Sequence, residues 1–185
     1  MEELTALKQR LEEERPDGWE KLPDIPLYMD QVVAYLSRQM ISFGDGDALT
    51  SAMINNYIKA GLLARANGKK YGQEHLAYLT AISAMKQVLS VREMRTLVAI
   101  GQEGRDCRRL YDFFCASLDR ALNETAGQLP DETDRRDLPK LVLDLALRSY
   151  ANALACREVL RILAGQEGCA DLLEQKKEDR GRRPP

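Results

Sequence analysis

Residues 49–71 join a short capped helix to a tight polar turn, and this combination restricts the folds open to the chain more than any other segment. Thr50 or Ser51 suits the N-cap of the helix, because a side-chain oxygen there accepts a hydrogen bond from an unpaired amide of the first turn. Gly61 suits its end, since glycine readily takes the left-handed conformation that follows many helices. The Asn-Gly pair at 67–68 then predicts a two-residue β-hairpin.

The outward side of this helix and the turn carry polar and basic side chains. Asn55 and Asn56 lie mid-helix, where asparagine is mildly unfavourable because its side chain competes for backbone hydrogen bonds. We interpret them either as contacts to bases or phosphates or as part of a solvated helix face. Lys69 and Lys70 lie on the turn. A helix followed by a basic hairpin is typical of a winged helix-turn-helix, whose helix enters the major groove of double-stranded DNA while the hairpin, the wing, contacts the backbone.

The candidate DNA contacts lie on the helix predicted at 50–60, on the wing predicted at 67–71, or in the segment between the two. Tyr57 admits two interpretations, a phosphate hydrogen bond or a half-buried packing role. The full set is Thr50, Ser51, Asn55, Asn56, Tyr57, Lys59, Arg65, Lys69, Lys70 and Tyr71.

Charge is distributed unevenly along the 185 residues. Residues 50–95 hold seven basic and two acidic side chains, whereas residues 1–49 hold five basic and eleven acidic ones. The positive segment therefore coincides with the predicted helix and wing, as a phosphate-contacting surface requires. The acidic segment supports an alternative hypothesis, in which residues 1–30 fold over the basic face of a helical protein-interaction or effector-binding protein that keeps the winged scaffold without binding DNA.

The rest of the chain predicts an all-α fold with a small β wing. Apolar residues at helical spacing indicate helices over 2–14, 27–40, 73–88, 90–101, 105–126 and 138–164. Ser90 and Glu93 match a capping box at the start of one of them. We expect an N-terminal helical arm at 1–21, a winged helix-turn-helix domain at 22–102, a helical dimerisation or effector region at 103–166 and a charged, disordered tail at 167–185.

The last predicted helix is apolar on most sides. Between Leu141 and Leu147 only Asp144 interrupts the apolar run, and such a helix must be covered on most of its surface. A second copy of the chain is the simplest cover, so we predict a homodimer through residues 105–165. The aromatic residues Tyr111, Phe113 and Phe114 either line a pocket for an unidentified small-molecule effector or form ordinary core.

Several function classes are disfavoured by what the sequence lacks. It has no Gly-rich phosphate loop and no nucleophile elbow, so we predict no enzyme. The four cysteines lack paired spacing and His75 stands alone, so we expect no metal or cofactor. We interpret the cysteines as free thiols, and a redox or metal-sensing role is the alternative. We interpret the Asp-Gly segment at 44–47 as a turn, not a calcium loop. Neither a signal peptide nor a membrane span is apparent, which favours a cytoplasmic protein.

Residues 53–63 resemble the recognition helix of MerR-type winged helix-turn-helix regulators, in which the pattern T-L-R-Y-Y-E-x-x-G-L-L is common. The matching or nearly matching positions are Tyr57, Lys59, Gly61, Leu62 and Leu63, while Asn55 replaces an arginine and Asn56 an aromatic residue. The N-G-Y-R wing of that family corresponds to residues 67–71. The resemblance implies a winged helix-turn-helix. Together with the predicted homodimer, it leads us to expect a sequence-specific regulator that binds an inverted repeat in double-stranded DNA.

A closer resemblance covers about residues 20–165. It is carried by residues 22–30, Leu49-Thr50, 53–59, 69–71 and 89–91. Together these segments are similar to a bacterial family catalogued only as a domain of unknown function, number 1836. That resemblance implies a transcriptional regulator without an established activity.

Overall fold

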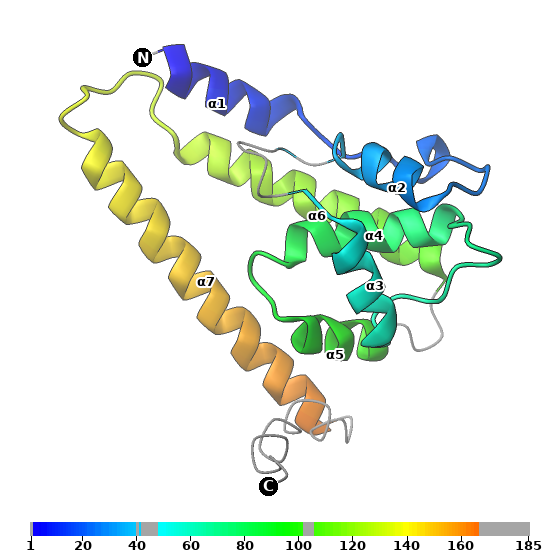
Figure 1. Cartoon of the computed structure of the whole chain (residues 1–185). Coiled ribbons are helices and arrows are strands. Elements are labelled where there is room, and N and C mark those ends of the chain that lie inside the picture. The colour runs from blue at the N-terminus through cyan, green and yellow to red at the C-terminus, as the bar shows by residue number, and fades with distance from the viewer. Residues whose placement is uncertain (1, 40, 42–47, 102–105, 167–185) are drawn as a thin grey trace, which may run out of the picture.

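The computed structural model describes residues 2–39, 41, 48–101 and 106–166, and this part of the chain is almost entirely helical (Figure 1). The elements are α1 (Glu2–Glu13), the 3₁₀ helix η1 (Trp19–Lys21), α2 (Met29–Leu36), α3 (Ser51–Lys59), α4 (Gln73–Met85), α5 (Val91–Gly101), α6 (Cys107–Gln128) and α7 (Leu138–Gln166). The all-α prediction is confirmed. The predicted turn at 44–47 and the predicted tail at 167–185 lie outside the described residues.

Helix α4 lies at the centre of the core. It packs against α2 and against α6, while α3 packs against α2 (Figure 1). Its inward side chains recur at helical spacing, and those of Leu76, Leu79 and Ile82 are completely buried. Val32 of α2 and Ile54 of α3 are buried with them. One continuous apolar core therefore joins the elements on either side of α4.

Helix α2 is shorter than the helix predicted over 27–40. Leu27 instead pairs with Tyr71: each amide donates to the other residue's carbonyl oxygen, at 2.9 and 2.8 Å. Because both backbone groups of Leu27 are committed to this bridge, the helix begins only at Met29. The amide of Tyr28 is capped by the side chain of Gln31 at 2.9 Å.

The predicted capping box at the start of α5 is confirmed. The amide of Ser90 donates to the carboxylate of Glu93 at 2.7 Å, and the amide of Glu93 donates to the Ser90 hydroxyl at 3.3 Å. The preceding helix ends at Met85, three residues earlier than predicted. Beyond its end, Leu89 is buried and Val88 is exposed.

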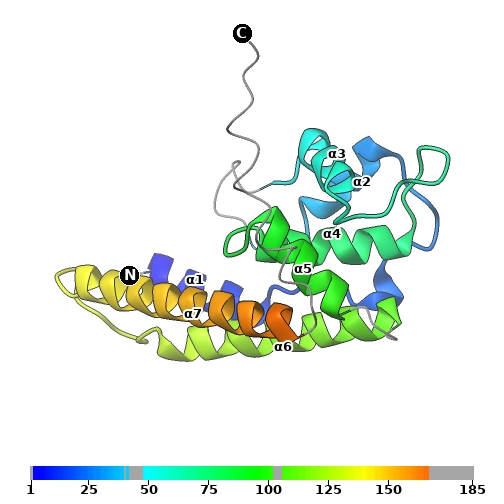
Figure 2. The ribbon, with the colours of Figure 1, turned by 90° about the horizontal axis from the view of Figure 1, so that it is seen from below.

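The acidic N-terminal arm packs along α6 and not over α3. Lys8 of α1 forms an ion pair with Asp131, and Arg15 pairs with Asp119 at 2.6 Å and with Asn123 at 2.9 Å. Figure 2 shows α1 and α6 on one side of α4, with α2 and α3 on the other. The part of the acidic segment up to Arg15 therefore does not lie over the basic face, because its pairing partners lie on α6 and in the segment after it. Leu27 and Tyr28, later in the same segment, do contact the basic turn, through Tyr71 and Lys70.

Helix α7 continues to Gln166, past the end at 164 that the sequence predicts, so Gly165 lies inside the helix. Glycine costs only about 1 kcal/mol inside a helix, so it does not end one unless the chain turns there. Near its C-terminal end the helix packs on α5, with Leu160 and Ala164 buried. Its N-terminal half runs away from the core (Figure 1), and most of its large apolar side chains are exposed.

Candidate nucleic-acid interface

Helix α3 is bounded by the residues that the sequence indicates. The Thr50 hydroxyl accepts a hydrogen bond from the amide of Met53 at 3.2 Å, which makes Thr50 the N-cap. At the other end Gly61 has a φ of 70°, and the amide of Leu62 returns to the carbonyl oxygen of Tyr57 at 2.9 Å. These local bonds define a helix of nine residues.

Helix α3 has one buried face and one exposed polar face. Ile54 is completely buried, whereas Asn55, Asn56 and Lys59 are exposed. Thr50 and Ser51 are also exposed at the first turn. The exposed face therefore presents two amides and one cation to solvent, the side-chain types that hydrogen-bond to base edges and phosphates.

The basic turn is a tight hairpin centred one residue later than the sequence predicts. Asn67 and Lys70 exchange two backbone hydrogen bonds of 3.0 Å each. The residues between them are Gly68, with φ of 55°, and Lys69, with φ of 71°, and this double left-handed conformation is that of a type I′ turn. The central pair is therefore Gly-Lys and not the predicted Asn-Gly. Lys69 thus lies at the tip in a backbone conformation that costs a non-glycine residue about 1–2 kcal/mol.

Lys70 leaves the tip on the returning arm of the turn. Its ammonium lies 5.1 Å from the centre of the Tyr28 ring, within the range of a cation–π contact. Tyr28 is half exposed and immediately precedes α2, so it joins the candidate surface although no sequence pattern indicated it. The contact orients Lys70 beside α2 and leaves its charge exposed.

Two of the predicted contacts, Tyr57 and Tyr71, are core residues. They are 4% and 5% exposed, and burial raises the pKa of both phenols. Tyr57 lies on the buried face of α3, and Tyr71 lies edge-on to His75 with 5.5 Å between ring centres. Both therefore support the candidate surface from beneath instead of facing a ligand.

His75 ties the start of α4 to the segment before the turn. Its Nδ1 accepts a hydrogen bond from the amide of Gly72 at 3.2 Å. This acceptor role assigns the ring proton to Nε2, which lies 3.4 Å from the carbonyl oxygen of Arg65. These contacts give His75 a positioning role between the start of α4 and the segment before the turn.

Arg95 of α5 joins the candidate surface, although it was not among the contacts predicted from the sequence. Its Nε lies 4.0 Å from the position a Cβ would take on Gly61, at the C-terminal end of α3. Arg95 is exposed, as are Lys59 and Arg65. Arg95 follows Gly61 by more than thirty residues, so only the packing of α5 brings its charge to α3.

Four of these cations, Lys59, Arg65, Lys69 and Lys70, come from α3 and the segment that follows it, and Arg95 lies near Gly61 at the end of α3. Figure 2 shows α3 and the segment that leads from it to α4 on the side opposite α1 and α6. Within the described part of the chain, no ion pair neutralises Lys59, Arg65, Lys69, Lys70 or Arg95. The surface is therefore electropositive although the whole chain carries a net charge of −2.

Comparison with known proteins assigns a family and no activity. No described helix has both the length and the apolar character to cross a membrane. Neither the curated proteins nor the solved structures give a match to this chain. A family model described as a domain of unknown function (DUF1836) matches residues 17–114, from Asp17 to Phe114 in α6, which is more than half of the chain. The chain therefore belongs to the DUF1836 family.

Proposed function

We propose that this chain is a DNA-binding transcriptional regulator, with α3 in the major groove and the 67–70 turn as a wing on the neighbouring backbone. One observation carries the proposal. Helix α3, whose outer face is polar and exposed, and the segment with the exposed lysines of the tight turn lie on the side of α4 opposite α1 (Figure 2). Polyanionic double-stranded DNA is the ligand whose charge fits this surface.

The two kinds of side chain suggest two kinds of contact. An exposed asparagine forms two hydrogen bonds to the N6 and N7 edge of adenine in the major groove, which makes Asn55 and Asn56 candidates for base recognition. Lys59, Lys69 and Lys70 carry compact charges suited to phosphates, which set affinity and register but not sequence. The left-handed backbone at Lys69 directs the chain sharply back on itself, so its side chain projects from the end of the hairpin.

We further propose that the regulator is a homodimer that pairs through α7. Leu143, Leu147, Tyr150 and Leu154 follow one another at intervals of four, three and four residues, which places them on one helix face, and each is 49–63% exposed. Packing within the chain uses a different face, through Leu160 and Ala164. A second copy supplies a matching stripe, and a two-fold dimer presents two α3 helices to an inverted repeat.

The test is a mobility-shift titration with DNA selected from a random pool, repeated over a range of salt concentrations. The double variant Lys69→Asn/Lys70→Gln should weaken binding to all sequences and flatten the log–log salt dependence by roughly 0.9 for each phosphate that the protein no longer neutralises. Asparagine is chosen at 69 because it tolerates the left-handed backbone. Asn55→Ala should cost about 1–3 kcal/mol on the best site and leave the salt slope unchanged.

The control is Lys140→Gln at the start of α7, which removes an exposed lysine elsewhere on the chain. It should leave both affinity and slope unchanged. If the selection recovers no bound sequence, or if the control lowers affinity as much as the wing variant does, the DNA-binding role assigned to α3 and the turn is wrong.

A second candidate is a helical interaction protein that keeps this scaffold without binding DNA. The exposed apolar stripe of α7 favours it, because such a surface also suits a protein partner. Retention on random duplex DNA at low salt separates the two. A chain that is not retained, yet still self-associates through α7, fits the second candidate.

A further inference from the structure

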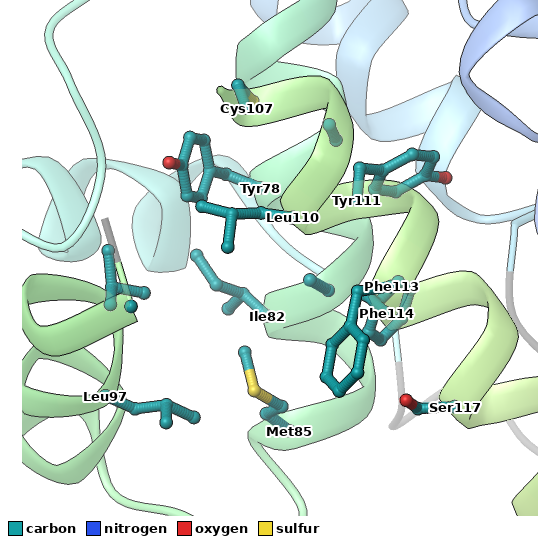
Figure 3. A pocket seen from close by; sticks show the side chains of 14 residues that line it. Tyr78, Ile82, Met85, Leu97, Cys107, Leu110, Tyr111, Phe113, Phe114 and Ser117 are labelled. Carbon is teal, nitrogen blue, oxygen red and sulfur yellow. The ribbon is translucent and has the colours of Figure 1, made fainter. Parts of the chain in front are cut away.

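A hollow of about 320 Å³ opens between α4, α5 and α6. Figure 3 shows it with the fourteen side chains that line it. The aromatic cluster singled out in the sequence lines this hollow: Tyr111 is buried, Phe114 is partly buried and Phe113 is 71% exposed. Phe113 is therefore not ordinary core, because the structure places its ring at the edge of an open space.

The hollow exists because small residues occupy positions where larger ones would fill it. Ala77 and Ala81 lie one turn apart on α4, Gly101 ends α5, and Ser117 lies on α6. Protein interiors normally pack without such gaps, since unfilled apolar space forfeits dispersion contacts. The remaining walls are aliphatic and aromatic side chains from all three helices (Figure 3).

No lining side chain carries a formal charge at neutral pH. The polar groups are the hydroxyls of Tyr78, Tyr111 and Ser117 and the thiol of Cys107. Burial, together with the nearby carboxylates of Glu74 and Asp106, raises the pKa of Cys107 to about 11, so the thiol stays protonated. An ion that entered would lose its hydration without gaining a partner, which is costly.

We propose that this hollow is a binding site for an uncharged, mainly aromatic or aliphatic small molecule. Its volume lies at the lower end of the ~300–1,000 Å³ range of small-molecule sites. The aromatic walls supply apolar contact, and Ser117 and Tyr78 supply hydroxyls at separate points of the wall that orient a polar substituent (Figure 3). Uncharged lining selects against ionic ligands of the same shape.

The site also extends the proposed function, on which this second step rests. The hollow is lined in part by α4, which begins three residues after the 67–70 turn, and by α5, which packs on α7. A ligand held against α4 and α5 therefore contacts the two elements that connect the proposed wing with the proposed dimer helix. We infer that the small molecule is an effector that changes DNA affinity.

The binding test compares two probes with the same ring system. Naphthalene-2-methanol is uncharged, whereas 2-naphthoate is an anion at pH 7. Isothermal titration of the full chain, without DNA, should show one saturable site per chain for the alcohol and at least tenfold weaker binding for the carboxylate. Equal affinity for the two probes, or no saturable binding of the alcohol, overturns the proposal.

Matched variants locate the probe. Ala81→Phe fills the hollow from α4 and should weaken binding of the alcohol at least tenfold, while Ala116→Phe, on the exposed side of α6, should leave it unchanged. Ser117→Leu repeats the test from the opposite wall, in case Ala81→Phe lowers the melting temperature. If Leu147→Lys on α7 abolishes binding instead, the probe occupies the α7 stripe or a site built by the second copy, and the assignment to this hollow is wrong.

The regulatory step has its own readout. Saturating naphthalene-2-methanol should shift the dissociation constant for the selected DNA at least fivefold in the wild type and not in Ala81→Phe. A probe that binds without this shift refutes the effector role and leaves the binding site in place. A chain that binds the probe and no DNA refutes the proposed function and the effector role that rests on it, and leaves the binding site in place.

Discussion

Tyr111 of α6 donates its hydroxyl hydrogen to the backbone carbonyl oxygen of Asp17, 94 residues earlier in the chain, at 2.7 Å. The carboxylate of Asp17 also accepts hydrogen bonds from Tyr35 at 2.9 Å and from Gln39 at 3.0 Å. One residue between α1 and η1 thus joins α2 to α6. The family match also begins at this residue.

Removing this bond should destabilise the fold. Tyr111→Phe leaves the ring in place and deletes only the hydroxyl, so the Asp17 carbonyl oxygen loses a partner in a part-buried position. We expect the free energy of unfolding to fall by about 1–2 kcal/mol. Urea denaturation measures it as a lower midpoint with an unchanged slope. Tyr150→Phe, at an exposed position of α7, should shift the midpoint little.

The type I′ turn predicts opposite effects at its two central residues. Lys69→Asn places a residue that tolerates positive φ at the tip and should raise the free energy of unfolding by up to about 1 kcal/mol. Gly68→Ala puts a Cβ on a φ of 55° and should lower it by about 1–2 kcal/mol. Thermal unfolding followed by circular dichroism compares them. Changes of the same sign would show that the chain does not hold this turn in solution.

The exposed stripe of α7 predicts a dimer that one charge disrupts. Leu147→Lys places an ammonium in the middle of the stripe and should convert the dimer to a monomer, because an unpaired buried charge is strongly disfavoured. Light scattering after size-exclusion chromatography gives the mass directly. Ser149→Lys, also exposed on α7 but outside the stripe, should remain dimeric. A wild-type chain that is monomeric at all concentrations rules out the proposed pairing.

Glu93 predicts a pH-dependent contribution to stability. Partial burial raises its pKa, but hydrogen bonds from Ser90 and the charge of Arg157 outweigh this, so the net pKa lies below its ordinary value. A carboxyl group whose folded pKa is lower than its unfolded pKa stabilises the fold above the unfolded value and stops doing so as the pH falls through the folded value.

Glu93→Gln should therefore lower the free energy of unfolding at pH 7 by about 1 kcal/mol, and the difference from wild type should shrink towards pH 3. Melting temperatures over this pH range measure the effect. Glu158→Gln, which removes only an exposed ion pair with Arg161, should have little effect at either pH. A difference for Glu93→Gln that is constant with pH would contradict the assigned ion pair.

The local features of this fold were readable in the sequence. Thr50, Gly61 and the Ser90–Glu93 pair act on backbone groups within a few residues of themselves, so each is determined by the chain nearby. The same holds for the existence of a hairpin near 67–70. The period of apolar residues likewise located α1, α2 and α4 to α7, with errors of a few residues at the ends, but it did not predict η1.

Tertiary packing decided which side chains reach the surface. Nothing near Tyr57 or Tyr71 in sequence distinguishes a phosphate contact from a core residue; burial came from elements that lie far along the chain. The pairing of Leu27 with Tyr71 overrode helix periodicity in the same way, and packing alone brought Arg95 to α3 and left the stripe of α7 uncovered. Caps and turns depend on neighbours a few residues away, whereas exposure depends on every segment that packs nearby, so the sequence determined the elements and the tertiary structure decided the surface.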